Sequence, residues 1–157
     1  MQIIRITEDD STQSNALARK LRVKIMSRVG TIEIPPHRDV GFQIPETLEE
    51  ILDWLLSSLS DKDTIVRYTA AKAVARIILS LPTSFSDEII STLFQKMDEG
   101  LLKESPEWDF SSVDENSWHG CLLCLADIAW HQPLPSNQIE ATITYSLNVW
   151  KFEICLM

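Results

Sequence analysis

Two adjacent amphipathic segments, joined by a very short acidic turn, dominate the sequence between Pro45 and Leu81. Apolar residues recur at the three- and four-residue spacing of one helix face in both segments. They are Leu48, Ile51, Leu52, Leu55, Leu56 and Leu59 in the first segment and Val66, Ala70, Ala73, Ile77 and Leu81 in the second. Asp63 is placed to cap the second helix, and Pro82 to end it. The pattern predicts an antiparallel helical hairpin with one apolar side.

The hairpin cannot cover its own apolar side, and the sequence repeats it. Residues 86–97 carry a stripe like that of the first helix, and residues 118–128 carry one like that of the second. A further helix is predicted after Pro135, with Ile139 and Ile143 on its apolar face. Helix pairs that recur about every 40 to 47 residues are typical of HEAT and armadillo arrays. We therefore predict an all-α fold, an α-solenoid of HEAT/armadillo-type antiparallel helix pairs.

The chain divides into five predicted segments. They are an N-terminal tail at 1–13, a basic helix at 14–30, a linker at 31–44, HEAT-like repeats at 45–143 with an acidic insert at 98–115, and a divergent C-terminal tail at 144–157. In the basic helix, Leu17, Leu21 and Ile25 are spaced by single turns. We interpret its lysines and arginines as a solvated face, or as a neighbour for the later acidic helix, rather than as a docking site. Solenoids usually need three or more repeats and only about two are visible, so we expect a piece of a longer protein.

Composition disfavours several classes of function. A formal net charge of −9 argues against nucleic acid as a general partner. Three cysteines, an odd number, in a chain without secretory features favour a reducing, cytosolic compartment. No stretch is long and apolar enough to cross a bilayer, and no Gly-rich phosphate loop is present. We expect no membrane span, no cofactor and no nucleic-acid partner.

Cys121 and Cys124 form a C-x-x-C pair that suggests a metal or redox site. They lie within a helical stripe, however, and no second pair of ligands accompanies them, whereas a structural zinc site needs four ligands. We interpret both as core cysteines, because a free cysteine behaves as a small buried hydrophobe. His119 has no nucleophile with an orienting acid nearby, so we do not expect it to act as a base. The sequence predicts no catalytic or metal site.

Six residues are predicted to shape the repeats rather than to bind a ligand. They are Asp63, Val66, Arg67, Trp118, His119 and Gly120. Arg67 is expected to bond to carbonyls of the neighbouring turn or to Asp63. We expect Trp118 to pack on the neighbouring helix, His119 to face the loop and Gly120 to allow two elements to approach closely. Trp54 is assigned to packing in preference to partner binding.

Two separated motifs resemble the HEAT segment of the tubulin-folding cofactor D family. The first, Asp61 to Lys72, contains the D-x-x-V-R opening of a HEAT helix and is similar to the family's DKDT-V-VR-W-S-AAKG. The second, Ser117 to Leu122, is similar to its W-H-G-G-C-L. The likeness departs from the family in residues 31–43, in a longer insert and from Thr144 onward. With the shortness of the chain, these departures lead us to expect a truncated or partial homologue.

The resemblance implies a chaperone without catalytic residues of its own. Members of the family capture β-tubulin and, with tubulin-folding cofactors C and E and an Arf-like small GTPase, assemble or take apart αβ-tubulin heterodimers. They also promote GTP hydrolysis by tubulin in that complex. A cytoplasmic, microtubule-associated location follows from this role. For the contact residues in this chain we predict the acidic insert, with Glu104, Glu107, Trp108 and Asp109 facing the partner.

Two other interpretations stay open. A generic HEAT-repeat adaptor or scaffold would share the helix pairs but lack the two motifs together. A small redox or metal enzyme would need Cys121 and Cys124 to be exposed and reactive.

Overall fold

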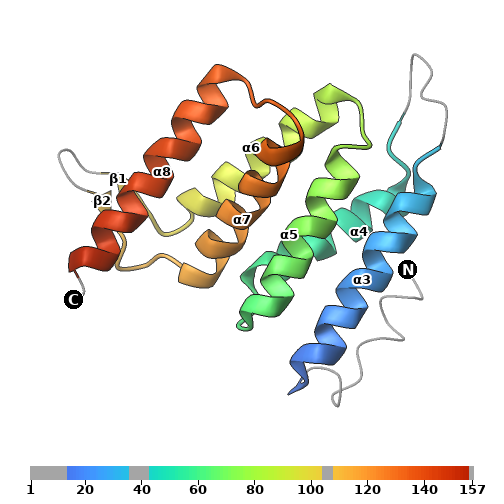
Figure 1. Cartoon of the computed structure of the whole chain (residues 1–157), viewed down its shortest axis with the longest axis horizontal. Coiled ribbons are helices and arrows are strands. Elements are labelled where there is room, and N and C mark those ends of the chain that lie inside the picture. Colours follow the sequence, from blue (N-terminus) through green and yellow to red (C-terminus); the bar gives the residue numbers. More distant parts are fainter. Residues whose placement is uncertain (1–13, 36–42, 104–107, 156–157) are drawn as a thin grey trace.

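Six α-helices and one short β-hairpin make up the part of the chain that the computed structural model describes, residues 14–35, 43–103 and 108–155, with side chains described to residue 148 (Figure 1). The helices are α3 (Ala16–Glu33), α4 (Glu46–Ser57), α5 (Thr64–Ile78), α6 (Thr83–Asp98), α7 (Glu115–His131) and α8 (Ser136–Cys155), with a 3-10 turn η1 (Ser58–Ser60) after α4. Strands β1 (Leu102–Lys103) and β2 (Trp108–Asp109) pair antiparallel between α6 and α7. The predicted all-α solenoid is confirmed.

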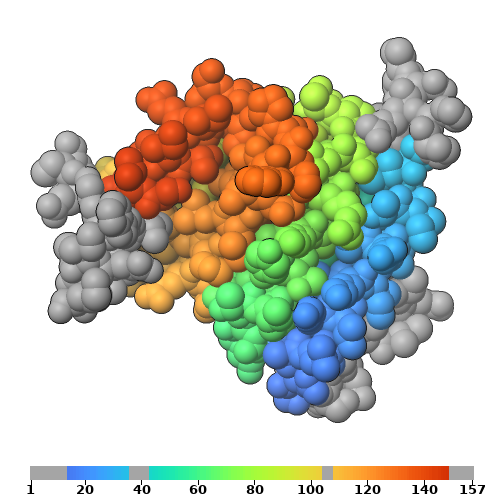
Figure 2. Space-filling model, viewed as in Figure 1, coloured from blue at the N-terminus to red at the C-terminus, as the bar shows by residue number. Residues whose placement is uncertain are grey.

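Helix α5 is the centre of the arrangement. It packs along α3 on one side and along α7 on the other. Figure 1 shows α3, α5 and α7 side by side, with α4 and α6 behind them, and Figure 2 shows the first three forming one continuous face. Helix α4 contacts α3 and α5, and α6 contacts α7, so that each pair adds its apolar side to one shared core. This is the two-layer packing of stacked helix pairs.

The predicted stripes of the central hairpin are buried. Leu48, Ile51 and Leu55 of α4 are fully enclosed, as are Ala70 and Ile77 of α5. The small residues that face neighbouring helices, Ala70, Ala71, Ala73 and Ala75, are at most 3% exposed. Burying a leucine or isoleucine side chain contributes roughly 1.5 to 3 kcal/mol to stability relative to leaving it in water. The hairpin therefore holds the repeats together through its apolar faces.

Two glycines lie where a helix approaches a neighbouring element closely. A Cβ added at Gly120 of α7 would lie 2.0 Å from the backbone oxygen of Leu59 in η1. A Cβ added at Gly30 of α3 would lie 2.9 Å from the Cδ1 atom of Ile77. The role predicted for Gly120 agrees with this geometry, since α7 rests directly on the backbone of the preceding turn.

The outer helices differ from the sequence prediction in the face they bury. Leu17, Leu21 and Ile25 of α3 are 50–60% exposed, and the helix instead buries the face that contains Val23 and Met26. On α8, Ile139 and Ile143 are likewise exposed, whereas Tyr145 is buried. Periodicity identifies an apolar stripe, but it does not say which neighbour the stripe meets.

The segment boundaries also differ in detail. Helix α3 continues to Glu33, into the predicted linker 31–44, of which residues 36–42 lie outside the described part of the chain. Helix α8 crosses residue 144 without a break and continues to Cys155. The acidic insert contains the β1–β2 hairpin where an exposed loop was predicted. None of the helices in the described ranges is long and apolar enough to cross a membrane.

Candidate functional site

Arg67, in the first turn of α5, connects the turn before it to the next repeat. The side chain is only 7% exposed. Its Nη1 atom donates hydrogen bonds to the backbone oxygens of Asp61 at 2.7 Å and Lys62 at 3.1 Å, and to Oδ1 of Asn116 on α7 at 2.7 Å. Its Nε atom donates to Nδ1 of His119 at 3.1 Å. The predicted bonds to turn carbonyls are confirmed, and the predicted alternative partner, Asp63, is not among these acceptors.

Asp63 serves a different cation. It stands at the N-cap position of α5, but its side chain makes no capping bond and instead pairs with Arg19 of α3. Arg19 also donates from Nε to Oδ2 of Asp61 at 2.8 Å, and Oδ1 of Asp61 accepts the backbone N–H of Asp63 at 2.8 Å. The prediction that the Asp63 side chain caps the helix is therefore wrong. The acidic turn joins α3 to α5 because a nearby guanidinium competes better for the carboxylate than the helix N–H groups do.

His119 lies beside this junction and accepts a hydrogen bond from Arg67. Partial burial and the positive charge of Arg67 both lower the pKa of the imidazole below its ordinary 6.5. The accepting Nδ1 must be unprotonated to receive the N–H of Arg67, so the neutral imidazole fits the site and the imidazolium does not. The position beside the 61–63 turn agrees with the predicted loop-facing orientation, and the ring acts as part of the brace.

Trp118 packs as predicted against the preceding helix. Its indole Nε1 donates to the backbone oxygen of Met97, near the end of α6, at 2.6 Å. The ring is 4% exposed and lies 5.3 Å from the centroid of Phe110 and 5.5 Å from that of Tyr145 on α8. These contacts enclose the indole while its polar N–H is satisfied, which is the condition for burying a tryptophan at low cost.

Of the four residues predicted to face a partner, two are described. Glu104 and Glu107 lie outside the described residues. Trp108 is half-buried, with its ring 5.3 Å from Tyr145 and 6.2 Å from Phe110, so it fastens β2 to the helices. Asp109 is exposed, and the backbone N–H of Ser111 lowers the pKa of its carboxyl group. The insert thus has an aromatic anchor and at least one carboxylate in solvent.

A polar cluster adjoins these rings. Lys103 of β1 lies 2.7 Å from Oδ1 of Asp98 and donates to the hydroxyl of Tyr145 at 2.9 Å, and that hydroxyl in turn donates to Asp98. Burial works against the charge on Lys103, but the bonds to Asp98 and Tyr145 outweigh it and raise the lysine pKa. Burial likewise raises the pKa of Tyr145. The cluster ties the hairpin to both α6 and α8.

The cysteines do not form a reactive pair. Cys121 and Cys124 are both free thiols with no exposed surface. Burial raises the pKa of Cys121 to about 11 and that of Cys124 well above its ordinary value. Within the described ranges, no group of three or more His, Cys, Asp or Glu side chains is arranged to hold a metal ion. Interpretation of the pair as core residues agrees with this burial, and Trp54, half-buried beneath the Arg22 guanidinium at 4.7 Å, is also part of the packing.

Comparison with known proteins decides the family. A family model described as tubulin-specific chaperone D-like armadillo repeats matches residues 34–155, which are most of the chain and include helices α4 to α8 but not α3. The chain belongs to this chaperone D-like family. No solved structure matches it.

Two relatives of the chaperone D-like segment cover it to different extents. Tubulin-folding cofactor D from Schizosaccharomyces pombe is 31% identical over 150 residues, which are 82% of this chain and 14% of that protein. Tubulin-specific chaperone D from Dictyostelium discoideum is 34% identical over 97 residues, which are 62% of this chain and 6% of that protein. The chain thus spans less than a sixth of the length of either relative. The match favours a chaperone D-like protein over a generic HEAT adaptor.

The sequence analysis did not identify four residues whose side chains connect separate elements of the fold. Arg19, Asp61, Asn116 and Tyr145 all make contacts that join separate elements. Arg19 and Asp61 are 42 positions apart, and no local pattern pairs them. Asn116 offered one usable signal, since it lies three residues before His119 and therefore on the same face of its helix.

Proposed function

We propose that this chain is part of a tubulin-folding chaperone and binds β-tubulin, taking part in the assembly and disassembly of αβ-tubulin heterodimers. The observation that carries the proposal is the match of residues 34–155 to the chaperone D-like repeats. The expected partners are β-tubulin, tubulin-folding cofactors C and E and an Arf-like small GTPase. The expected location is the cytoplasm, in association with microtubules.

The mechanism we propose is physical rather than chemical. The chain supplies an extended helical surface that holds one tubulin subunit until the other arrives, and a stable complex of this kind needs roughly 1,200 to 2,000 Å² of buried surface. Stimulation of GTP hydrolysis would then arise from tubulin held in the complex, with no catalytic group from this chain.

We further propose that the acidic insert, residues 98–115, is the part that faces the partner. Its support is the exposed carboxylate of Asp109 next to the anchor formed by Trp108, Phe110 and Tyr145. An aromatic anchor that holds an exposed carboxylate in place presents a defined surface at low entropic cost. Glu104 and Glu107 are proposed to extend the same surface.

The test is co-purification of tubulin with the full chain immobilised on beads and incubated with cytosol. We expect β-tubulin to be retained in excess over α-tubulin, and the Arf-like GTPase to be retained with it. The proposed function would be rejected if the chain retained neither α- nor β-tubulin while its circular dichroism showed that it was helical.

A charge-reversal variant tests the insert separately. Glu104→Lys, Glu107→Lys and Asp109→Lys together should weaken tubulin retention, whereas Asp87→Lys, Glu88→Lys and Glu140→Lys on the exposed faces of α6 and α8 change the net charge equally and should leave it intact. If the insert variant retains as much tubulin as the control, the binding surface lies elsewhere, and only the assignment of the insert is lost.

A further inference from the structure

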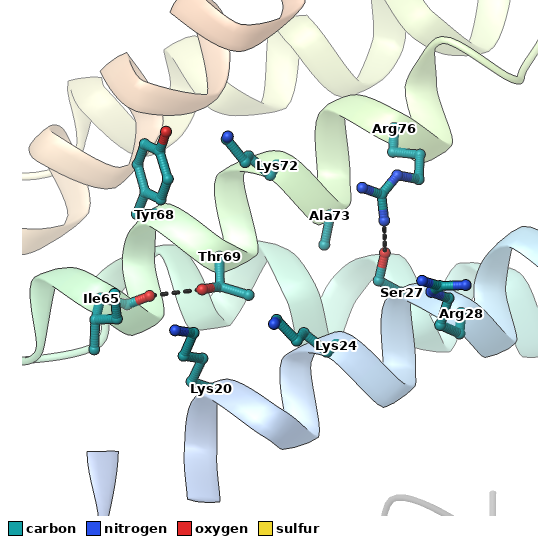
Figure 3. A pocket seen from close by; sticks show the side chains of 10 residues that line it. All are labelled: Lys20, Lys24, Ser27, Arg28, Ile65, Tyr68, Thr69, Lys72, Ala73 and Arg76. Carbon is teal, nitrogen blue, oxygen red and sulfur yellow. Dashed lines mark hydrogen bonds between the residues drawn. The ribbon is translucent and has the colours of Figure 1, made fainter. Parts of the chain in front are cut away.

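A basic groove lies between α3 and α5. Its walls carry Lys20, Lys24 and Arg28 from α3 and Lys72 and Arg76 from α5, each series at helical four-residue spacing. The groove has a volume of about 480 Å³. Figure 3 shows the two rows of cations on either side of it, with Ser27, Thr69 and Ala73 among its other lining residues. The feature is unexpected in a protein whose formal net charge is −9.

The cations of the groove are only weakly engaged within the part of the chain that the structure describes. No carboxylate lines the groove. Nη1 of Arg76 reaches Oγ of Ser27 at 3.5 Å, the outer limit of a hydrogen bond, and Nζ of Lys72 lies 4.6 Å from the ring centroid of Tyr68. The neighbouring Tyr68 side chain raises the pKa of Lys72 the most, with smaller contributions from the attraction of Asp127 on α7 and the repulsion of Arg76. Like charges four residues apart on one helix destabilise one another, and a bound anion lowers that cost.

The apolar content of the groove distinguishes among anions. Ile65 and Tyr68, each 46% exposed, lie among the lining residues at the N-terminal end of α5. An aliphatic or aromatic side chain of a peptide can rest on them while its neighbouring carboxylates meet the lysines and arginines. A nucleic-acid duplex keeps its bases stacked inside and presents phosphates and sugars outward, so it has no aliphatic side chain to place on Ile65.

We propose that this groove is a binding site for an acidic peptide segment of a partner protein. Lys20 and Arg28 are separated by two turns of helix, roughly 12 Å, which matches about four residues of an extended peptide. The occupant is therefore a short run of Glu or Asp with an apolar residue at one end. The proposal concerns a surface separate from the acidic insert and does not depend on tubulin being the partner.

The experiment measures fluorescence anisotropy of a labelled twelve-residue peptide that contains eight glutamates, one leucine and one phenylalanine, titrated with the full chain. Lys24→Glu with Lys72→Glu should weaken binding by roughly tenfold or more, because two attractions become repulsions. Lys62→Glu with Lys96→Glu changes the net charge equally, outside the groove, and should weaken it by less than about threefold. The same peptide with glutamine in place of glutamate should not bind.

Each remaining outcome decides the matter. Equal losses in the two double variants would show that only net charge is sensed and would overturn the proposal. Displacement of the peptide by a DNA duplex of matched charge at equal concentration would also overturn it, in favour of a general polyanion site. If Lys24→Glu with Lys72→Glu loses its helical circular dichroism, the milder Arg28→Gln with Arg76→Gln replaces it. An affinity unchanged by that variant would contradict the assignment.

Discussion

Arg67 shows how one side chain joins two repeats. It is buried, yet four of its hydrogen-bond acceptors come from the preceding turn and from α7, so the guanidinium spans the boundary between helix pairs. A buried cation is tolerated only where such acceptors surround it. Arg67 is therefore a structural brace, as its place in the D-x-x-V-R motif predicted.

Replacing Arg67 by lysine should lower the free energy of unfolding by about 3 kcal/mol, because a single ammonium group cannot reproduce the planar fork of donors. The measurement is urea unfolding followed by circular dichroism. Arg76→Lys, at an exposed position with one weak bond to Ser27, is the matched control and should change stability by less than about 0.5 kcal/mol. If the two substitutions lowered the stability equally, the interpretation of Arg67 as a structural brace would be contradicted.

His119 makes stability depend on pH in a defined direction. Its pKa is lowered in the folded chain, so the unfolded chain binds the proton more readily. The contribution of the neutral ring is complete above its ordinary pKa of 6.5 and is lost as pH falls toward the lower folded value. Urea midpoints of the wild type should therefore fall faster than those of His119→Gln between pH 7.5 and 5, because glutamine can still accept from Arg67 but does not titrate. Parallel pH profiles would contradict this account.

Cys121 and Cys124 should resist thiol reagents in the native protein. The experiment uses the Cys155→Ser variant, in which Cys121 and Cys124 are the two cysteines left of the three in the sequence. A pKa raised from 9.0 to about 11 at Cys121 lowers the thiolate fraction at pH 8 about 100-fold, and burial blocks access in addition. We expect two thiols to react with an Ellman reagent in urea and neither to react promptly without it. Rapid native labelling would reopen the interpretation of the pair as a redox site.

At the scale of elements, the glycine contacts set how closely the repeats stack. Gly120→Ala should cost at least about 3 kcal/mol of stability, since the new methyl group would meet the rigid backbone of Leu59. Gly30→Ala is the matched substitution in another helix. There the methyl group meets side-chain ends of Ile77 and Ile51, which can move, and we expect a change within about 1 kcal/mol. Thermal unfolding of both variants checks the difference, and a tolerated Gly120→Ala would show that α7 and η1 are not in close contact.

The central hairpin was predictable from the sequence, whereas its surroundings were not. The α4 and α5 stripes follow helical spacing, and burial confirms them. Leu17, Leu21 and Ile25 of α3 have the same helical spacing, but the spacing does not say which element they would contact, and these side chains are exposed. Periodicity reports that a helix has an apolar face, but the partner of that face depends on contacts distant in the sequence. The sequence favours a solvated face for Lys20, Lys24 and Arg28 because charge runs are usually solvated. The opposing Lys72 and Arg76 lie on another helix, so no local pattern predicts the groove between them.

The acidic insert illustrates a second limit. Its composition predicted an exposed loop, and its carboxylates at Asp98 and Asp109 are indeed exposed. The aromatic residues Trp108 and Phe110 contact Trp118 and Tyr145, and Tyr145 belongs to a segment predicted to lie beyond the repeats. Ring packing across 37 residues, from Trp108 to Tyr145, leaves no local signature in the sequence.

At the scale of the whole molecule, the exposed apolar side chains of the end helices and the small share of the relatives' length that the chain covers belong together. The described solenoid is a compact stack of helix pairs, and its end helices α3 and α8 expose aliphatic side chains such as Ile32 and Leu147. The chain also spans 14% of one cofactor D relative and 6% of another. Helices of a solenoid bury such stripes on neighbouring repeats. We therefore propose that this chain is a folded segment of chaperone D-like repeats that keeps a binding surface of its own.

The most direct test of that claim is the affinity of the purified full chain for purified tubulin, measured by thermophoresis on a sample whose helical circular dichroism has been recorded. We predict a strongly helical spectrum and saturable binding with a Kd in the micromolar range or tighter, which corresponds to a binding free energy of about −8 kcal/mol. A helical chain that shows no saturable binding to tubulin at roughly a hundred times that concentration would contradict it.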